Sequence, residues 1–220
     1  DTLIFSMNKS WKTYSVFVSS TFSDMQAERD YLRTQLLPEV NDILKKHAIK
    51  LRLIDLRWGI STLESDECTI EEKVLQVCLN EIKRSRPFFL GLLGDRYGWI
   101  PPYEKMRKMS ADYLGKSITD IVITNGFLQQ EQILGAWIME RDCICYDTMN
   151  ETSLEMFTDN QDADADLKKE KLKSLKETIK IHLSQSGRLH CYGTYSPVWN
   201  GESFVGLEQF GNTLKEMMVN

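Results

Sequence analysis

Hydroxyl side chains gather where the first strongly apolar run of the sequence ends. In TYSVFVSSTFSDMQAERD the run is followed by three hydroxyl residues, Ser19, Ser20 and Thr21. A stretch with helical spacing begins directly after them. The start of a helix favours phosphate or another anion, because the helix dipole is positive there. Ser23, followed three residues later by Gln26, fits a capping box, which predicts that Ser23 caps a helix beginning at Asp24.

Charged and aromatic side chains follow two further apolar runs. DLRWG comes after the run at 51–54, and GDRYGW comes after FFLGLL. Arginine pairs with phosphate in a bidentate way, and flat aromatic faces suit a base or a sugar. The candidate binding residues from these two stretches are Arg57, Trp58, Asp95, Arg96, Tyr97 and Trp99. Together with the three hydroxyls they predict a nucleotide-sized pocket. Structural roles remain open: Asp55 and Arg57 suit an ion pair on one strand face, and the aromatic rings suit core packing.

Several kinds of chemistry lack their usual motifs. The chain contains no G-x-x-x-x-G-K-[ST], no G-x-G-x-x-G after a strand and no G-x-S-x-G, so ATP hydrolysis and dinucleotide redox chemistry are disfavoured. The five cysteines are scattered and odd in number, which predicts free thiols in a reducing compartment such as the cytoplasm. The three histidines do not cluster with acids, so no metal site is predicted.

The elements that would position these residues alternate between strand and helix. Short β-rich runs at 15–18, 51–58 and 88–93 predict strands, and the last of them is apolar enough for a strand buried on both faces. Helical spacing at 24–46 and 70–85 fills the gaps between them. Pro38 predicts a break in the first helix near Leu37, and Thr69 with Glu72 suggests a capping box for the second. The remaining predictions are a short helix at 103–114, an ambiguous stretch at 117–134, a strand at 135–146, a helix at 167–183, a strand at 188–193 and a terminal helix from Gly206.

This alternation with short connections predicts an α/β fold with a parallel sheet between two helical layers, flavodoxin-like, with strand and helix additions near the C-terminus. In open parallel sheets, ligands bind beyond the carboxyl ends of the strands. The polar stretches SSTFSD, DLRWG and GDRYGW are therefore expected along one edge of the sheet, together with the segment that follows RDCICY.

Composition limits the partners. The 220 residues are 42% hydrophobic and 27% charged, as in an ordinary soluble domain, and the net charge of −5 gives no basic surface for nucleic acid. The longest apolar stretch, PFFLGLLG, is far too short to span a bilayer, so no membrane partner is expected. The first residues show neither an initiator Met nor a secretion signal, which suggests a piece of a longer polypeptide.

Four separated motifs carry a family resemblance. VFVSSTFSDMQAERDYL, LRLIDLRWGIS, CLNEIKRSRPFFLGLLGDRYGWIPP and the closing GLEQFG together resemble the DUF4062 family, over most of residues 14–146 and the last helix. The resemblance implies a divergent Toll/interleukin-1-receptor (TIR) fold on the N-terminal side of a NACHT-type (STAND) signalling ATPase, in some relatives with WD repeats. We therefore expect a core at 1–148 and a completing segment at 167–220 that leads towards the ATPase. Between them, the polar and acidic composition of residues 149–166 predicts a mobile surface loop.

The resemblance also raises an enzymatic reading. Some TIR domains cleave NAD with a Glu on the helix after the fourth conserved block, where negative charge stabilises ribose cation character. Many DUF4062 sequences carry [ST]-x-T-E-x-E at the comparable place, and here the segment reads SITDIVI. Thr119 and Asp120 match, but Val122 stands where the Glu is expected. Asp120 or Glu131 could supply the acid only in a different helix register.

Two functions from different classes follow. The first is a non-catalytic signalling or scaffold domain that packs against its downstream ATPase region, forms homo-oligomers or recruits protein partners, and needs no cofactor. The alternative is an NAD(P) glycohydrolase with NAD as substrate, Asp120 as the catalytic acid and the pocket residues named above. A pocket that senses a nucleotide or nucleic acid without turnover is a third interpretation.

Overall fold

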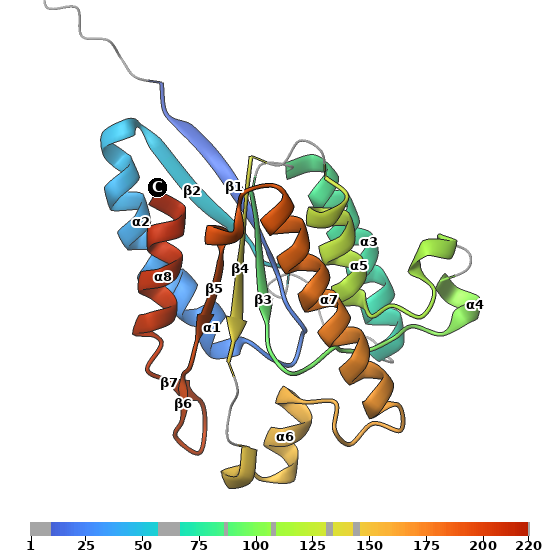
Figure 1. Ribbon diagram of the computed structural model, residues 1–220. Coiled ribbons are helices and arrows are strands. Elements are labelled where there is room, and N and C mark those ends of the chain that lie inside the picture. The colour runs from blue at the N-terminus through green and yellow to red at the C-terminus, as the bar shows by residue number, and fades with distance from the viewer. Residues whose placement is uncertain are drawn as a thin grey trace, which may run out of the picture.

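Five parallel strands form the central sheet of this chain. The computed structural model describes residues 10–56, 67–85, 88–106, 109–130, 134–142 and 146–219. The sheet order is β2-β1-β3-β4-β5, and every pair is parallel (Figure 1). The strands are β1 (Lys12–Ser19), β2 (Ile49–Ile54), β3 (Phe88–Leu93), β4 (Gly135–Arg141) and β5 (Tyr192–Tyr195). This is the flavodoxin-like strand order, so the predicted parallel α/β fold is confirmed.

The bounds of several strands differ from the sequence prediction. The predicted strand 135–146 ends at Arg141, where the chain leaves the sheet. The predicted strand 188–193 begins only at Tyr192, because Leu189–Cys191 form a turn of 3-10 helix, η7, before it. The strand at 51–58 was placed two residues too late, since β2 begins at Ile49. Each error lies at an element boundary and leaves the order of the elements unchanged.

One helical layer packs on the face of the sheet formed by Phe17, Phe89 and Ile138. It contains α3 (Glu67–Ser85), α5 (Ile118–Ile123) and α7 (Ala165–Gln185) (Figure 1). The helix at 70–85 is thus confirmed with an earlier start, and most of the ambiguous stretch is helical, as α5 followed by the π-helical turn η5 (Thr124–Leu128).

The other helical layer packs on the alternate residues of the same strands, such as Val16, Leu90 and Met139. It contains α1 (Gln26–Tyr31), α2 (Leu37–Leu44) and α8 (Glu208–Val219) (Figure 1). Because successive side chains of a strand point to opposite faces, apolar runs such as FFLGLL fill both layers. The three-layer arrangement follows directly from that pattern.

The first long helix is interrupted as Pro38 predicts. A π-helical turn, η1 (Leu32–Leu36), joins α1 to α2 just before Pro38, which lies in the first turn of α2 and has no N–H to bond back into the preceding turn. A turn of 3-10 helix, η2 (Lys45–His47), ends the segment.

The predicted cap of this helix was wrong. The N-cap is Met25, at φ 62°, with no side-chain cap, and Ser23 lies in the bend before it. Asp24 shapes the turn instead, since its Oδ1 accepts a hydrogen bond from the Met25 N–H at 2.6 Å.

The carboxyl edge of the sheet is covered by two small elements. One is α6 (Glu151–Phe157), which follows the 3-10 turn η6 (Tyr146–Thr148), and the other is the hairpin of β6 (Val198–Trp199) and β7 (Phe204–Val205) (Figure 1). Phe157 and Phe204 meet edge to face with ring centroids 4.9 Å apart. The segment 149–166, predicted as a surface loop, is therefore helical over Glu151–Phe157 and contributes buried residues.

The remaining elements are short. The predicted helix at 103–114 is described as two pieces, α4 (Tyr103–Met106) and the 3-10 turn η4 (Ala111–Tyr113). Within the described residues, none of the helices combines the length and the apolar character needed to cross a membrane.

Candidate functional site

A small cavity lies at the carboxyl end of β1, beside the point where the strand order reverses. Its volume is about 20 Å³, which is room for about one water molecule and far below the size of a usual ligand pocket. The described residues that line it are Phe17, Val18, Ser19, Ser20, Phe22, Arg29, Asp55, Leu56, Cys78, Ile118, Thr119 and Val122. Two of the three predicted hydroxyl residues are thus at the expected place, and Thr21 is buried next to them.

Among the described lining residues of this cavity the cation is Arg29, and sequence reasoning missed it. Its guanidinium forms an ion pair with Asp55, and its Nε and Nη2 donate to Ser20 Oγ at 3.1 and 2.6 Å. Burial lowers the pKa of Arg29, against the opposing effect of Asp55. In AERD the residue looks like part of a solvated helix face, and only the tertiary fold turns it towards the end of β2.

The helix α5 presents Thr119 and Val122 to the cavity, but the Asp120 carboxylate makes other contacts. Asp120 Oδ2 accepts a hydrogen bond from Tyr97 Oη at 2.6 Å, and Oδ1 accepts one from Thr124 Oγ1 at 3.0 Å. Burial and this carboxylate together raise the pKa of Tyr97. The register of α5 therefore places the apolar Val122, where the resemblance led us to expect a Glu, at the same cavity as Ser19 and Arg29.

The loop after β3 turns away from this cavity and binds the segment before α7. Asp95 Oδ2 accepts a hydrogen bond from Tyr146 Oη at 2.6 Å, and Arg96 Nη1 donates to the carbonyl of Glu155 at 2.9 Å. The side chain of Tyr97 is 1% exposed and that of Trp99 is partly buried, and both pack in the core. The predicted single pocket is thus divided between the cavity at β1 and a separate contact region at residues 95–98.

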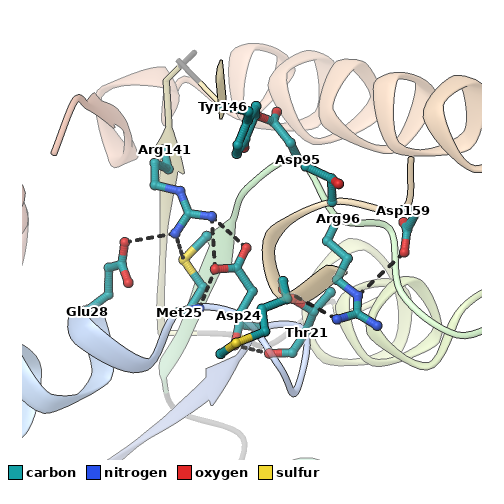
Figure 2. Close-up of polar contacts among 12 residues, drawn as sticks. Thr21, Asp24, Met25, Glu28, Asp95, Arg96, Arg141, Tyr146 and Asp159 are labelled. Carbon is teal, nitrogen blue, oxygen red and sulfur yellow. Dashed lines mark hydrogen bonds and ion pairs between the residues drawn. The ribbon is translucent and has the colours of Figure 1, made fainter. Parts of the chain in front are cut away.

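A buried charge cluster lies at the end of β4, and sequence reasoning missed it too. Arg141 Nη2 donates to both carboxylate oxygens of Asp24, at 2.8 and 2.7 Å, and Nη1 donates to Glu28 Oε1 at 3.2 Å (Figure 2). Tyr195 Oη donates to the same Glu28 oxygen at 2.9 Å. Burial raises the pKa of Asp24 to about 6, against the lowering effect of Arg141. A signal for this cluster is present in the sequence: two carboxylates four residues apart, and an arginine at the end of a buried run.

Three residues named from the sequence lie outside the described residues: Arg57, Trp58 and Glu131. The others keep their positions near the carboxyl edge, but they do not share one pocket.

The strand order, the two helical layers and the polar carboxyl edge define a flavodoxin-like parallel α/β domain. The chain belongs to the family described as "Domain of unknown function (DUF4062)", whose model matches residues 15–183. The expected membership is confirmed.

The curated relatives are much longer proteins. The chain is 46% identical over 92 residues to telomerase protein component 1 of Mus musculus, an alignment that covers 42% of this chain and 3% of that protein. It is 27% identical over 181 residues to a TPR repeat-containing protein of Dictyostelium discoideum, covering 74% of this chain and 10% of that protein. It is 33% identical over 101 residues to NACHT domain- and WD repeat-containing protein 1 of Mus musculus, covering 43% and 6%. The chain therefore spans a small part of each of these relatives, and no solved structure gave a significant match.

Proposed function

We propose that this domain is a non-catalytic signalling or scaffold module of a larger NACHT-type protein, in which it self-associates or recruits a protein partner. The relatives support this context, because one of them is named NACHT domain- and WD repeat-containing protein 1. In such a protein the downstream ATPase region would be its first partner. The free thiols of Cys78 and Cys191 suit a cytoplasmic location.

The observation that carries the proposal is the position of Val122 at the cavity of β1. Glycosyl-bond cleavage needs a carboxylate beside the forming ribose cation, and Val122 cannot supply one. The carboxylate of Asp120 is instead bound to Tyr97 and Thr124. The cavity of about 20 Å³ is also too small for a nucleotide.

The direct test is incubation of the assembled full-length protein with NAD and with NADP, followed by measurement of nicotinamide. We expect no release above the rate of a heat-denatured sample, even at high protein concentration. Release that depends on assembly would overturn the non-catalytic assignment.

A second test separates the cavity from the outer surface. Thr119→Ala changes the wall of the cavity, whereas Gln76→Glu with Lys83→Glu changes exposed positions of α3. We expect Thr119→Ala to leave self-association unchanged in sedimentation velocity runs. The double variant of α3 should weaken self-association about tenfold or more. The exposed α7 residue Lys169, changed to Glu, is the matched surface control. Folded cavity variants that no longer assemble would contradict the scaffold role.

The alternative, an NAD(P) glycohydrolase, draws support from one feature: Ser19, Ser20, Arg29 and Asp55 place polar groups at the strand-order reversal where nucleotides bind in such sheets. It requires that the cavity open and that a carboxylate become available in it: either Asp55, which is paired with Arg29, or Asp120, which would have to leave Tyr97 and turn towards the cavity. If the alternative holds, Asp120→Ala abolishes nicotinamide release, whereas Asp112→Ala, an exposed acid on η4, leaves it unchanged.

A further inference from the structure

The loop after β3 surrounds a carboxylate from a distant part of the chain. Asp159 Oδ2 accepts hydrogen bonds from the backbone N–H of Tyr97 at 2.6 Å and of Gly98 at 3.1 Å. Arg96 Nε lies 3.5 Å from the other oxygen, Oδ1 (Figure 2). Two successive amides and a guanidinium therefore converge on one anionic group.

The geometry of this loop is that of an oxyanion site. Successive N–H groups next to a residue with positive φ form a concavity that binds anions, and Gly98 has φ +95°. The guanidinium of arginine matches the oxygens of phosphate as well as those of carboxylate. The Asp159 carboxylate is 7% exposed, so it is enclosed by these donors.

The same loop holds the whole segment that carries Asp159. Arg96 Nη1 donates to the carbonyls of Glu155 and Met156, at 2.9 and 3.3 Å, which satisfies the C-terminal end of α6. Asp95 forms a parallel β-bridge with Thr158 and accepts the hydroxyl hydrogen of Tyr146. Residues 146–159, called the cover below, are therefore fastened at both ends by residues 95–98.

The cover lies over the part of the sheet where open parallel sheets bind ligands. The guanidinium carbon of Arg141, at the end of β4, is 5.5 Å from the ring centre of Phe157 in the cover and 4.4 Å from that of Phe204 in the hairpin. Arg141 is only 1% exposed. Movement of the cover would therefore uncover the end of β4.

We propose that residues 95–98 form a phosphate-binding site that the chain's own Asp159 occupies, so that the phosphate group of a small ligand competes with Asp159 and releases the cover. The site offers two amide donors and the Arg96 guanidinium, a set of donors that suits the several oxygens and double charge of phosphate. This site is distinct from the cavity at β1, so failure of this proposal would leave the scaffold proposal standing.

The test uses Asp159→Ala, which empties the site, and Asp162→Ala as the matched control. Asp162 belongs to the same acidic segment, but its carboxylate pairs with Lys168 and not with residues 95–98. Inorganic phosphate is the probe, against chloride at equal ionic strength. For a dissociation constant of about 5 mM, we expect about 50 mM phosphate to raise the Tm of Asp159→Ala by about 3 °C more than that of Asp162→Ala.

Amide resonances give the second measurement. In Asp159→Ala, phosphate should shift the ¹H–¹⁵N signals of Tyr97 and Gly98, and the wild type should show a weaker response because its own carboxylate competes. An equal Tm rise in both variants, or unmoved signals of these two amides, would overturn the proposal. Rescue by acetate without rescue by phosphate would also overturn it, because the loop would then be a structural carboxylate lock.

If Asp159→Ala does not fold, the milder variant Asp159→Asn tests the same competition. Asp159→Asn keeps an oxygen for the amides and loses the charge that holds Arg96. Its Tyr97 and Gly98 signals should respond to phosphate more strongly than those of the wild type, and equal responses would contradict the competition.

Discussion

Replacement of Arg141 by Met tests the buried charge cluster most directly. The change removes the cation that faces Asp24 and Glu28, and both carboxylates are 0% exposed. Loss of one partner from a buried ion pair leaves an uncompensated charge and costs about 3–5 kcal/mol. We therefore expect the free energy of unfolding of Arg141→Met to fall by this amount near neutral pH.

The loss should depend on pH, and its sign follows from Asp24. The pKa of this carboxyl is about 6 in the folded protein and 3.8 when unperturbed. The folded state thus holds the proton more tightly, so the contribution of Asp24 to stability is largest below pH 4 and is lost as the pH rises through 6. A shift of about two pKa units corresponds to about 3 kcal/mol.

Without Arg141 this decline should extend to higher pH, because the attraction that lowers the Asp24 pKa is gone. Urea unfolding followed by tryptophan fluorescence, at about pH 5 and about pH 7.5, measures both effects. The destabilisation relative to wild type should be smaller at the lower pH. Arg84→Met, at a side chain 77% exposed and paired with Glu81 on α3, is the control and should change stability by about 0.5 kcal/mol or less. A loss below about 1 kcal/mol at the higher pH, or equal losses at both, would refute the reasoning.

Three further outcomes are expected. Gly94→Ala should lower the free energy of unfolding by about 1–3 kcal/mol, because the new Cβ would lie 2.7 Å from Asp24 Oδ2 and 2.9 Å from Arg141 Nη2, both held in the buried cluster. Thermal unfolding measures the loss. The control is Ser184→Ala at an exposed position, since Gly187 has a φ of +69° that strains any other residue. Ser117→Ala should cost about 1 kcal/mol, because Ser117 Oγ caps α5 by accepting the Asp120 N–H at 3.2 Å, and an unchanged urea midpoint would argue against the cap. Cys78 should resist iodoacetamide at neutral pH until the protein unfolds, since burial raises its thiol pKa to about 12; peptide mass spectrometry would reveal any early labelling.

The fold was predictable because its signals are local. The runs SVFV and FFLGLL are almost entirely apolar, and the helical stretches between them have clear spacing, so strand, helix and order could be assigned. The ends were less certain. Arg188–Cys191 carry a strand-like composition, but the chain turns there before β5, and no local signal marks where pairing with β4 begins.

The site was only partly predictable. The location of Ser19 and Ser20 at the carboxyl edge follows from the strand rule, and so does the neighbouring Thr21. Sequence spacing could not show that Arg29 pairs with Asp55, or that Arg141 pairs with Asp24, because each pair joins elements that are remote along the chain. For the same reason the sequence could not show that Arg96, predicted as a ligand contact, also binds the end of α6.

The prediction for the acidic segment 149–166 was the least accurate. TDNQDADAD is polar, and composition alone suggests a solvated loop. Phe157 and Thr158, directly before those acids, are nevertheless buried, and Asp159 accepts hydrogen bonds from two backbone amides. A single apolar residue such as Phe157 can hold the segment against the rest of the fold. The average composition of the segment does not reveal it.

The strand β5 and the helix α8 also bear on how the domain is produced. The family match stops at residue 183, whereas β5 pairs with β4 from Tyr192 onwards, and Phe210 and Leu214 of α8 are fully buried. A recombinant fragment cut at the match boundary would leave β4 as a bare sheet edge beside an uncovered apolar face, the arrangement that favours edge-to-edge aggregation. Expression should therefore extend through Val219.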